Sequence, residues 1–173
     1  MTEQQSYRVV EVLQRDPLVE VRDYDACTVA DVVVHGDLER AGSAAFGPLV
    51  GYISSHKLAM TAPVLQEEGA GAGDWQVSFV LPGGQLPSAY PLPSDARVAL
   101  REVSAHRAVA LRWSGRWTAK ALDQHTAQLR DIAIASGLRP SGAIRWARYD
   151  PPWTPPFMRR NEVIVAVAEG PQP

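Results

Sequence analysis

Four histidines, one cysteine and scattered carboxylates are the side chains of this chain that could carry acid–base or metal chemistry. Ser54 and Ser55 place hydroxyls beside the imidazole of His56, but adjacency in sequence is no evidence of a nucleophile and its base. The carboxylates show no spacing typical of a general acid/base pair. The sequence also lacks GxSxG, HExxH, a P-loop and the glycine pattern of dinucleotide-binding folds. We therefore predict no catalytic residue; the sequence favours a protein that is not an enzyme, without deciding this.

One of the histidines, His56, lies where metal binding is an alternative, because neutral imidazole is a common metal ligand. His56 follows the first predicted helix, where a chain crossing from helix to strand could direct a side chain into a cleft. His35 ends a predicted strand and could instead cap local backbone. A solvent-facing His56 is the alternative to a ligating one. His125 lies on the apolar face of the second predicted helix, which favours a packed, hydrogen-bonded side chain, and His106 is expected in an exposed turn.

The single cysteine, Cys27, lies in an alternating apolar stretch. One cysteine excludes an intrachain disulfide, and without a CxxC motif a structural zinc site is not expected. A half-buried small side chain is the simplest interpretation.

The composition is typical of a globular protein. The chain has 173 residues, of which 46% are hydrophobic and 21% charged, and a net charge of −2; this length folds without disulfides or metals. The near-neutral charge and the lack of a basic run exclude nucleic acid and anionic membranes as expected partners. No apolar run approaches the ~18 residues that span a bilayer, and the N-terminus lacks signal-peptide features. We expect a cytoplasmic protein without membrane insertion.

A weak internal repeat organises the elements that must position these residues. Residues 19–24 resemble residues 98–103, and the same offset aligns Gly36 with Gly115. In each copy a short strand turns at a small residue and returns as a second strand, over 28–35 and 107–114, and a helical pattern follows the glycine. Further strands are predicted at 62–66, 75–81, 143–149 and 163–168. The result is an α+β fold with two strand-strand-helix-strand halves.

Apolar periodicity predicts both helices. In the first, the apolar positions begin at Leu38, and Asp37 is suited to cap the N-terminus. Pro48 interrupts it, so we expect a kink there or a helix restarted with this proline in its first turn. The second helix carries Leu122 and Leu129 on one face and stops at Gly137.

The stretch "RYDPPWTPPFMRRNEV", residues 148–163, is a stiff loop with large apolar side chains. Its four prolines fix φ, so the loop has little freedom to lose when a ligand binds. Trp153, Phe157 and Met158 either form an exposed ligand-binding patch or fold back to close the core. Arg159 and Arg160 could fork onto a ligand's carboxylates, although pairing with a neighbouring acidic side chain is the commoner arrangement.

Two stretches give the chain a family resemblance. "MTAPV" (60–64) after "GYI" (51–53), and "YDPPWTPPFMRRNEV" near the C-terminus, resemble the SOUL haem-binding protein family; "WQVSFVLP" (75–82) also fits. The resemblance covers about residues 7–167. It implies a distorted antiparallel β-barrel of eight or nine strands with two α-helices, built from two pseudo-symmetric halves. We expect one domain at residues 7–168, with flexible termini at 1–6 and 169–173.

The resemblance further implies a tetrapyrrole, haem b or a related porphyrin, in a shallow groove between the first helix and the proline-rich loop. The wall from the helix would comprise Phe46, Leu49, Val50 and Ile53. The wall from the loop would comprise Trp153, Phe157 and Met158, with Lys57 and Arg159 at the rim for the propionates.

The histidine that binds the iron in some family members has no counterpart at the same position of this chain. Some members use a histidine directly before the tyrosine of the strand that matches "VRDY", and Asp23 occupies that position here. Other members bind haem without a histidine. If an axial ligand exists, His56 is the first candidate and His35 the second.

Three functions follow from the resemblance. The first is a haem carrier, buffer or scavenger, acting as a monomer or weak homo-oligomer. The second is an enzyme that removes the iron or opens the ring, with chemistry supplied largely by the cofactor. The third is a general small-molecule effector-binding module, which a similar pseudo-symmetric fold provides in some transcription regulators.

Overall fold

The computed structural model describes residues 3–168 of the chain. The chain divides into two compact units. Unit 1 comprises residues 1–5 and 25–105, and unit 2 comprises residues 6–24 and 106–173. The predicted domain, 7–168, includes parts of both units. Of the termini predicted to be flexible, residues 1–2 and 169–173 lie outside the described residues, and Glu3–Gln4 form strand β1.

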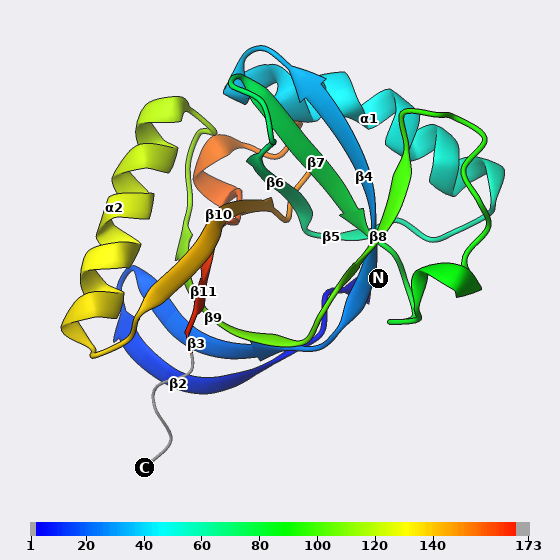
Figure 1. Cartoon of the computed structure of the whole chain (residues 1–173). Helices are drawn as coiled ribbons and strands as arrows, with labels where there is room; N and C mark the ends of the chain where they lie inside the picture. Colours follow the sequence, from blue (N-terminus) through cyan, green and yellow to red (C-terminus); the bar gives the residue numbers. More distant parts are fainter. Residues whose placement is uncertain (1–2, 169–173) are drawn as a thin grey trace. The chain divides into compact units, whose positions relative to one another are not determined.

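Unit 1 contains a four-stranded antiparallel sheet in the order β8-β4-β7-β6 and one long helix, α1. Helix α1 contacts β4 and β7 (Figure 1). A short parallel pair, β1 and β5, adds to it. The elements are β1 (Glu3–Gln4), β4 (Cys27–His35), α1 (Leu38–Ser55), β5 (Thr61–Ala62), β6 (Val64–Glu68), β7 (Asp74–Val80), the 3₁₀ turn η1 (Pro87–Ala89) and β8 (Ala99–Val103).

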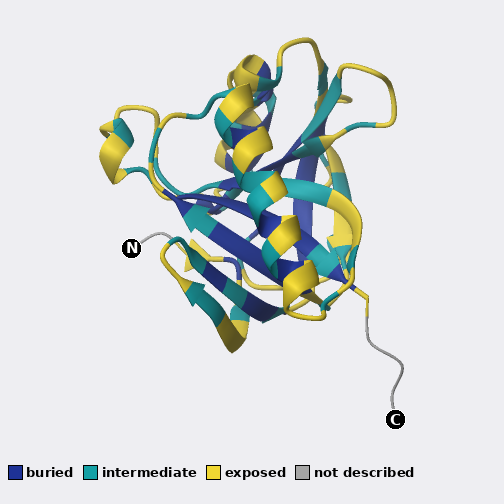
Figure 2. Cartoon of the chain, turned by 90° about the vertical axis from the view of Figure 1, so that its left-hand side faces the viewer, coloured by how far each residue is buried: buried dark blue, intermediate teal, exposed yellow. Residues whose placement is uncertain are grey.

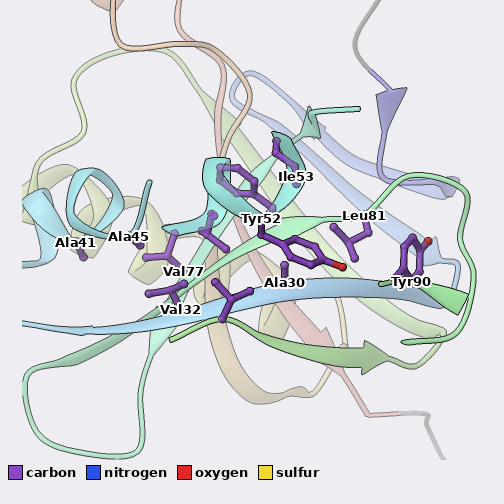
Figure 3. Packing of buried hydrophobic residues seen from close by; sticks show 12 residues of the cluster. Ala30, Val32, Ala41, Ala45, Tyr52, Ile53, Val77, Leu81 and Tyr90 are labelled. Atoms are coloured by element: carbon purple, nitrogen blue, oxygen red, sulfur yellow. The ribbon is translucent and has the colours of Figure 1, made fainter. Parts of the chain in front are cut away.

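The core of unit 1 forms where α1 lies on the sheet. Ala41 and Ala45, four residues apart on α1, face Val32 and Val77 from β4 and β7 (Figure 3), and Leu49, four residues further along, is buried in the same cluster. This spacing puts the small side chains on one face, so the helix can approach the sheet closely.

Helix α1 begins where the sequence predicts and continues through its proline. The Asp37 carboxylate accepts a hydrogen bond from the Glu39 backbone N–H at 2.8 Å, as an N-cap does. The helix is neither ended nor restarted at Pro48, which lies in its interior. Proline costs the helix a backbone hydrogen bond, and the buried face on either side of it stabilises the helix despite this loss.

Unit 2 contains a five-stranded antiparallel sheet in the order β2-β3-β9-β11-β10, and α2 packs on β9, β10 and β11 (Figure 1). Strands β9 and β11 are largely buried, whereas β2 and most of the connecting loops are largely exposed (Figure 2). The elements are β2 (Tyr7–Arg15), β3 (Leu18–Tyr24), β9 (His106–Trp113), α2 (Ala119–Ala135), β10 (Pro140–Arg148), the 3₁₀ turn η2 (Pro156–Met158) and β11 (Asn161–Val167).

Helix α2 has the ends that the sequence indicates. Thr118 caps the N-terminus, where its Oγ1 accepts a hydrogen bond from the Ala121 N–H at 3.2 Å. Gly137 follows the C-terminus with φ of +78°, a left-handed conformation that glycine adopts without strain. Leu122 and Leu129 are fully buried, as their periodicity predicts.

The internal repeat is real, but its first strands exchange partners. The two predicted local returns were wrong: β3 pairs with β2 and β9, and β4 pairs with β7 and β8. Strand β8 belongs to the second copy of the repeat and pairs with β4 of the first, while β3 of the first copy pairs with β9 of the second. Each compact unit therefore contains one strand from the other copy. Strand β3, with β2, makes unit 2 discontinuous in sequence, whereas unit 1 is discontinuous because β1 pairs with β5.

The α+β class is confirmed, with nine antiparallel strands, four in unit 1 and five in unit 2, and two α-helices within residues 3–168. Neither strand order returns to its first strand, so the term barrel describes these sheets only loosely. Neither helix of the described chain is long and apolar enough to cross a membrane.

Candidate functional site

The proline-rich loop of unit 2 runs from the end of β10 to the start of β11 and is closed at its base. The Tyr149 N–H donates to the Arg160 carbonyl at 3.1 Å. Asp150 accepts from the Arg160 backbone N–H at 2.6 Å and from its guanidinium at 2.9 and 3.1 Å. These bonds hold the pKa of the Asp150 carboxyl below its usual range. We call residues 149–160 the proline loop.

Arg159 fixes the interior of the proline loop. Its Nε donates to the Thr154 carbonyl at 2.7 Å, and its Nη2 donates to the Pro152 carbonyl at 2.6 Å. The 3₁₀ turn at Pro156–Met158 is closed by backbone bonds from Met158 and Arg159. Proline rings and these bonds together restrict the loop to one conformation, which lowers the entropy lost on binding.

The three large apolar side chains of the proline loop point to solvent. Trp153 is 84% exposed, Phe157 77% and Met158 60%. The sequence leaves two interpretations open for these side chains. Because they are exposed, they do not fold back to close the core. Three such side chains on one pinned loop form an apolar patch of the kind that marks a ligand or partner surface.

The predicted wall from α1 belongs to unit 1, and its residues differ in exposure. Phe46 is exposed and lies edge-on to Phe79 at 6.0 Å between ring centroids, and Val50 is half-buried. Leu49 and Ile53 are buried in the core of unit 1. Lys57, just beyond the helix, is exposed and has φ of +53°. The two predicted walls lie in different compact units, and the groove between them stays a prediction.

His56 is the C-cap of α1, and its ring is fixed on one side. Its Nδ1 lies 2.9 Å from the Tyr52 carbonyl oxygen and 3.1 Å from Ser55 Oγ. A carbonyl oxygen only accepts, so in the neutral ring Nδ1 carries the proton and Nε2 presents its lone pair. This tautomer is the one in which Nε2 can ligate a metal.

The other histidines have different surroundings. His35 is exposed, with Nδ1 3.0 Å from the Asp74 carboxylate. His125 stacks on Trp113 at 4.5 Å between centroids, and burial lowers its pKa, which confirms the packed interpretation. His106 is half-buried and stacks on Tyr24, not in the exposed turn that we expected. Cys27 is buried, not half-buried as the sequence suggested, and it forms no disulfide among the described residues. Within residues 3–168 no three His, Cys, Asp or Glu side chains gather as a metal site.

A buried charge cluster in unit 2 is the feature that sequence reasoning missed. The Glu162 carboxylate accepts from Arg22 at 2.7 and 2.9 Å, from Arg112 at 2.8 Å and from the Tyr149 hydroxyl at 2.7 Å. Burial alone would raise the pKa of Glu162, but the hydrogen bonds and charges of the two arginines lower it overall. Burial and the nearby Glu162 charge raise the pKa of Tyr149. The available signal was a glutamate inside the apolar strand "NEVIVAV", which must find a partner.

The sequence of Arg159 and Arg160 suggested a fork onto a ligand or pairing with a neighbouring acid. Arg160 forms an ion pair with Asp150, and Arg159 donates to backbone carbonyls. Glu162 is bound by Arg22 and Arg112 instead. Both loop arginines therefore stabilise the proline loop itself.

Comparison with known proteins places the chain in a family. The model of the SOUL heme-binding proteins matches residues 2–166, nearly the whole chain. The chain belongs to the SOUL family. Membership supports haem or another tetrapyrrole as the class of ligand. No curated protein matches the chain significantly.

Solved structures show the same fold in proteins of distant sequence. The C-terminal domain of EcmrR has a TM-score of 0.70 at 11% identity, covering 88% of this chain and 98% of that one. A hydrolase from Listeria innocua has a TM-score of 0.60 at 14% identity, covering 87% and 91%. SAV2435 bound to tetraphenylphosphonium has a TM-score of 0.54 at 12% identity, covering 87% and 93%. At these identities the likeness concerns the fold alone.

Proposed function

We propose that this SOUL protein is a cytoplasmic carrier, buffer or scavenger of haem or a related tetrapyrrole. The proline loop of unit 2 would contact the macrocycle, and the outer face of α1 in unit 1 is the second surface that the family resemblance implies. Family membership supports the class of ligand, and the exposed apolar side chains of the proline loop support the place.

The observation that carries the proposal is the exposure of Trp153, Phe157 and Met158 on a pinned loop. A porphyrin is a flat apolar surface, and planar aromatic side chains cover such a surface well. Because the loop is already rigid, the contact costs little conformational entropy. An aromatic pair held out to solvent has no comparable role in stabilising unit 2.

The residues of α1 divide into those that would touch the ligand and those that would support them. Phe46 and Val50 have accessible surface and would contact the macrocycle. Leu49 and Ile53 are buried and would support that surface from beneath. Exposed Lys57 supplies a cation for a propionate, and Arg159 retains N–H groups beyond the two that bind the loop.

His56 fits the iron better than His35 does. Both have Nδ1 engaged, but His56 bonds a backbone carbonyl at the end of a helix, whereas His35 bonds a flexible carboxylate at an exposed strand end. When bound, haem supplies an iron with open axial positions, and a neutral imidazole Nε2 is its common protein ligand. The backbone bond of His56 fixes the ring that would face the iron.

A hemin titration followed by Soret absorbance tests the proposal. Wild type should saturate at one equivalent, and Trp153→Ala/Phe157→Ala should bind at least about tenfold more weakly, because truncating buried aromatic anchors typically costs 2 kcal/mol or more. The matched control is Ile134→Ala, an exposed apolar side chain on α2. Non-saturating broadening with wild type would overturn tetrapyrrole binding. Equal affinity of the double variant and the control would overturn the place.

A lipophilic cation is the second candidate ligand, favoured by the exposed ring of Trp153 and by the structure of SAV2435 with tetraphenylphosphonium. Such a ligand would make the chain an effector-binding module. Tetraphenylphosphonium should then bind as tightly as hemin and displace it. Failure to displace hemin at a hundredfold excess would exclude this function for the same surface.

A further inference from the structure

Aromatic and basic side chains gather where the proline loop joins the sheet of unit 2. Trp113 of β9 pairs across the sheet with Asn161 of β11, and Asn161 pairs with Arg148 of β10. Trp117, in the connection to α2, stacks on Trp113 with 6.4 Å between centroids and 15° between planes. The Arg148 guanidinium carbon lies 4.4 Å from the centroid of the Trp117 ring. The two indoles and this guanidinium therefore form one contiguous group.

Both indoles of this group have a buried Nε1–H with no hydrogen-bond acceptor among residues 3–168. The indole N–H of Trp75 donates to the Gly36 carbonyl, and that of Trp146 donates to Thr126 Oγ1. Buried donors are nearly always paired, and leaving one unpaired costs about 1–3 kcal/mol. Two unpaired donors on stacked neighbouring rings indicate an acceptor from outside the chain.

Arg159 brings a second guanidinium to this group. Two of its five N–H groups bind the carbonyls of Thr154 and Pro152, which leaves three donors, and it forms no salt bridge with a carboxylate of the described chain. It lies close enough to Arg148 that its positive charge, after burial, helps to lower the pKa of Arg148 to about 10.

We propose that Trp113, Trp117, Arg148 and Arg159 form a binding site for an oxyanion, the carboxylate or phosphate group of a small molecule. Every donor in this set suits oxygen: a guanidinium fork matches the two oxygens of either group, and an indole N–H donates only. A cation or a neutral donor would leave both indoles unpaired. The site lies at the base of the proline loop, so an apolar body attached to the oxyanion would meet Phe157 or its neighbours on the same loop.

The five tryptophans allow a direct test by ¹H–¹⁵N NMR of their indole N–H groups. Sodium phosphate and sodium acetate are titrated separately at constant ionic strength, and the five signals are assigned with single Trp→Phe variants. The signals of Trp113 and Trp117 should shift and saturate, whereas those of Trp75 and Trp146 should stay in place because their donors are already bonded. Tighter binding of phosphate identifies a phosphate ester as the ligand class, and tighter binding of acetate a carboxylic acid.

Two variants test the donors, and Trp117→Phe is the more specific one because Arg159→Gln also removes the two bonds to loop carbonyls. Arg159→Gln should weaken the anion by about tenfold or more, since a hydrogen bond to a charged group contributes roughly 1.5–3 kcal/mol. Trp117→Phe, which keeps an aromatic ring but removes the N–H, should weaken it by a smaller factor. The control is Arg8→Gln, an exposed arginine of unit 2 paired with Asp23. Unshifted Trp113 and Trp117 signals with both anions, or equal shifts of all five signals, would overturn the site. The titration contains no tetrapyrrole, so this result is independent of the hemin result.

Discussion

The Arg22 guanidinium and the Glu162 carboxylate form a two-point ion pair in the interior of unit 2. Nη1 donates to Oε2 at 2.9 Å and Nη2 to Oε1 at 2.7 Å, and the side chains are 1% and 0% exposed. Parallel bonds of this kind are among the strongest between side chains. Burial makes each partner depend on the other, because an isolated charge in this position would be strongly destabilising.

Glu162→Gln should therefore lower the free energy of unfolding by about 3–5 kcal/mol, the usual cost of leaving one charge of a buried pair without its partner. Denaturant unfolding measures this. Glu11→Gln, on the exposed part of β2, is the control and should change stability by less than about 0.5 kcal/mol. A loss below 1 kcal/mol in Glu162→Gln would show that the pair contributes little.

The same pair predicts a pH dependence. The pKa of Glu162 is lowered in the folded protein from its ordinary value of 4.5, so the unfolded state takes up the proton first as the pH falls. The stabilisation is complete above about pH 4.5 and is lost as the pH falls further, through the lower pKa of the folded state. The stability difference between wild type and Glu162→Gln should thus shrink below pH 4.5. A constant difference down to pH 3 would contradict the assignment to the carboxylate.

The sequence predicted the positions of the helices and strands better than it predicted which strands pair with each other. Both helices and most strands lie within a few residues of the predicted ranges, because apolar periodicity and glycine stops are local signals. The returns from β3 to β4 and from β8 to β9 were wrong because pairing such as Val19 with Leu111 depends on residues far apart in sequence. Strand β2 was not predicted at all, since it pairs with β3 alone and is mostly exposed, which removes the alternation of buried and exposed residues.

The candidate site was predictable only in part. Proline content predicted a rigid loop, but the composition of the loop could not decide whether Trp153 and Phe157 are exposed. The repeat-equivalent arginines, Arg22 and Arg101, both bind buried carboxylates, Glu162 in unit 2 and Asp31 in unit 1. No local pattern marks either pair, because each joins strands that are distant in sequence.

Opening the base of the proline loop should weaken ligand binding with little loss of stability. Asp150→Asn removes the charge that binds Arg160, and a partly exposed pair of this kind contributes only about 0–1 kcal/mol. Amide hydrogen exchange of Met158 and Arg159 should become faster, and hemin affinity should fall. Asp95→Asn, which breaks a similar exposed pair with Arg97 in unit 1, is the matched control. Faster exchange without weaker hemin binding would contradict the role given to loop rigidity.

The interior proline of α1 predicts that the helix can be stabilised. Pro48→Ala restores a backbone donor to the helix, and the gain should exceed the added entropy of the unfolded chain, for a net increase of about 1–2 kcal/mol. Gly47→Ala should add about 0.5–1 kcal/mol, because the new Cβ would meet nothing within 4 Å. Thermal unfolding measures both. A lower melting temperature for Pro48→Ala would mean that tertiary packing requires the conformation that proline imposes.

Iron ligation is the last prediction, and it depends on the tautomer of His56. In the neutral ring, Nδ1 donates to the Tyr52 carbonyl at 2.9 Å, so the lone pair is on Nε2, the nitrogen that would ligate the iron. His56→Ala should therefore shift or abolish the Soret maximum of the hemin complex while the apolar contacts still hold the ring. His35→Ala is the matched control, since its imidazole is also bonded through Nδ1, to Asp74. A spectrum changed only in His35→Ala would transfer the ligand to that residue, and unchanged spectra of both variants would contradict ligation by either histidine.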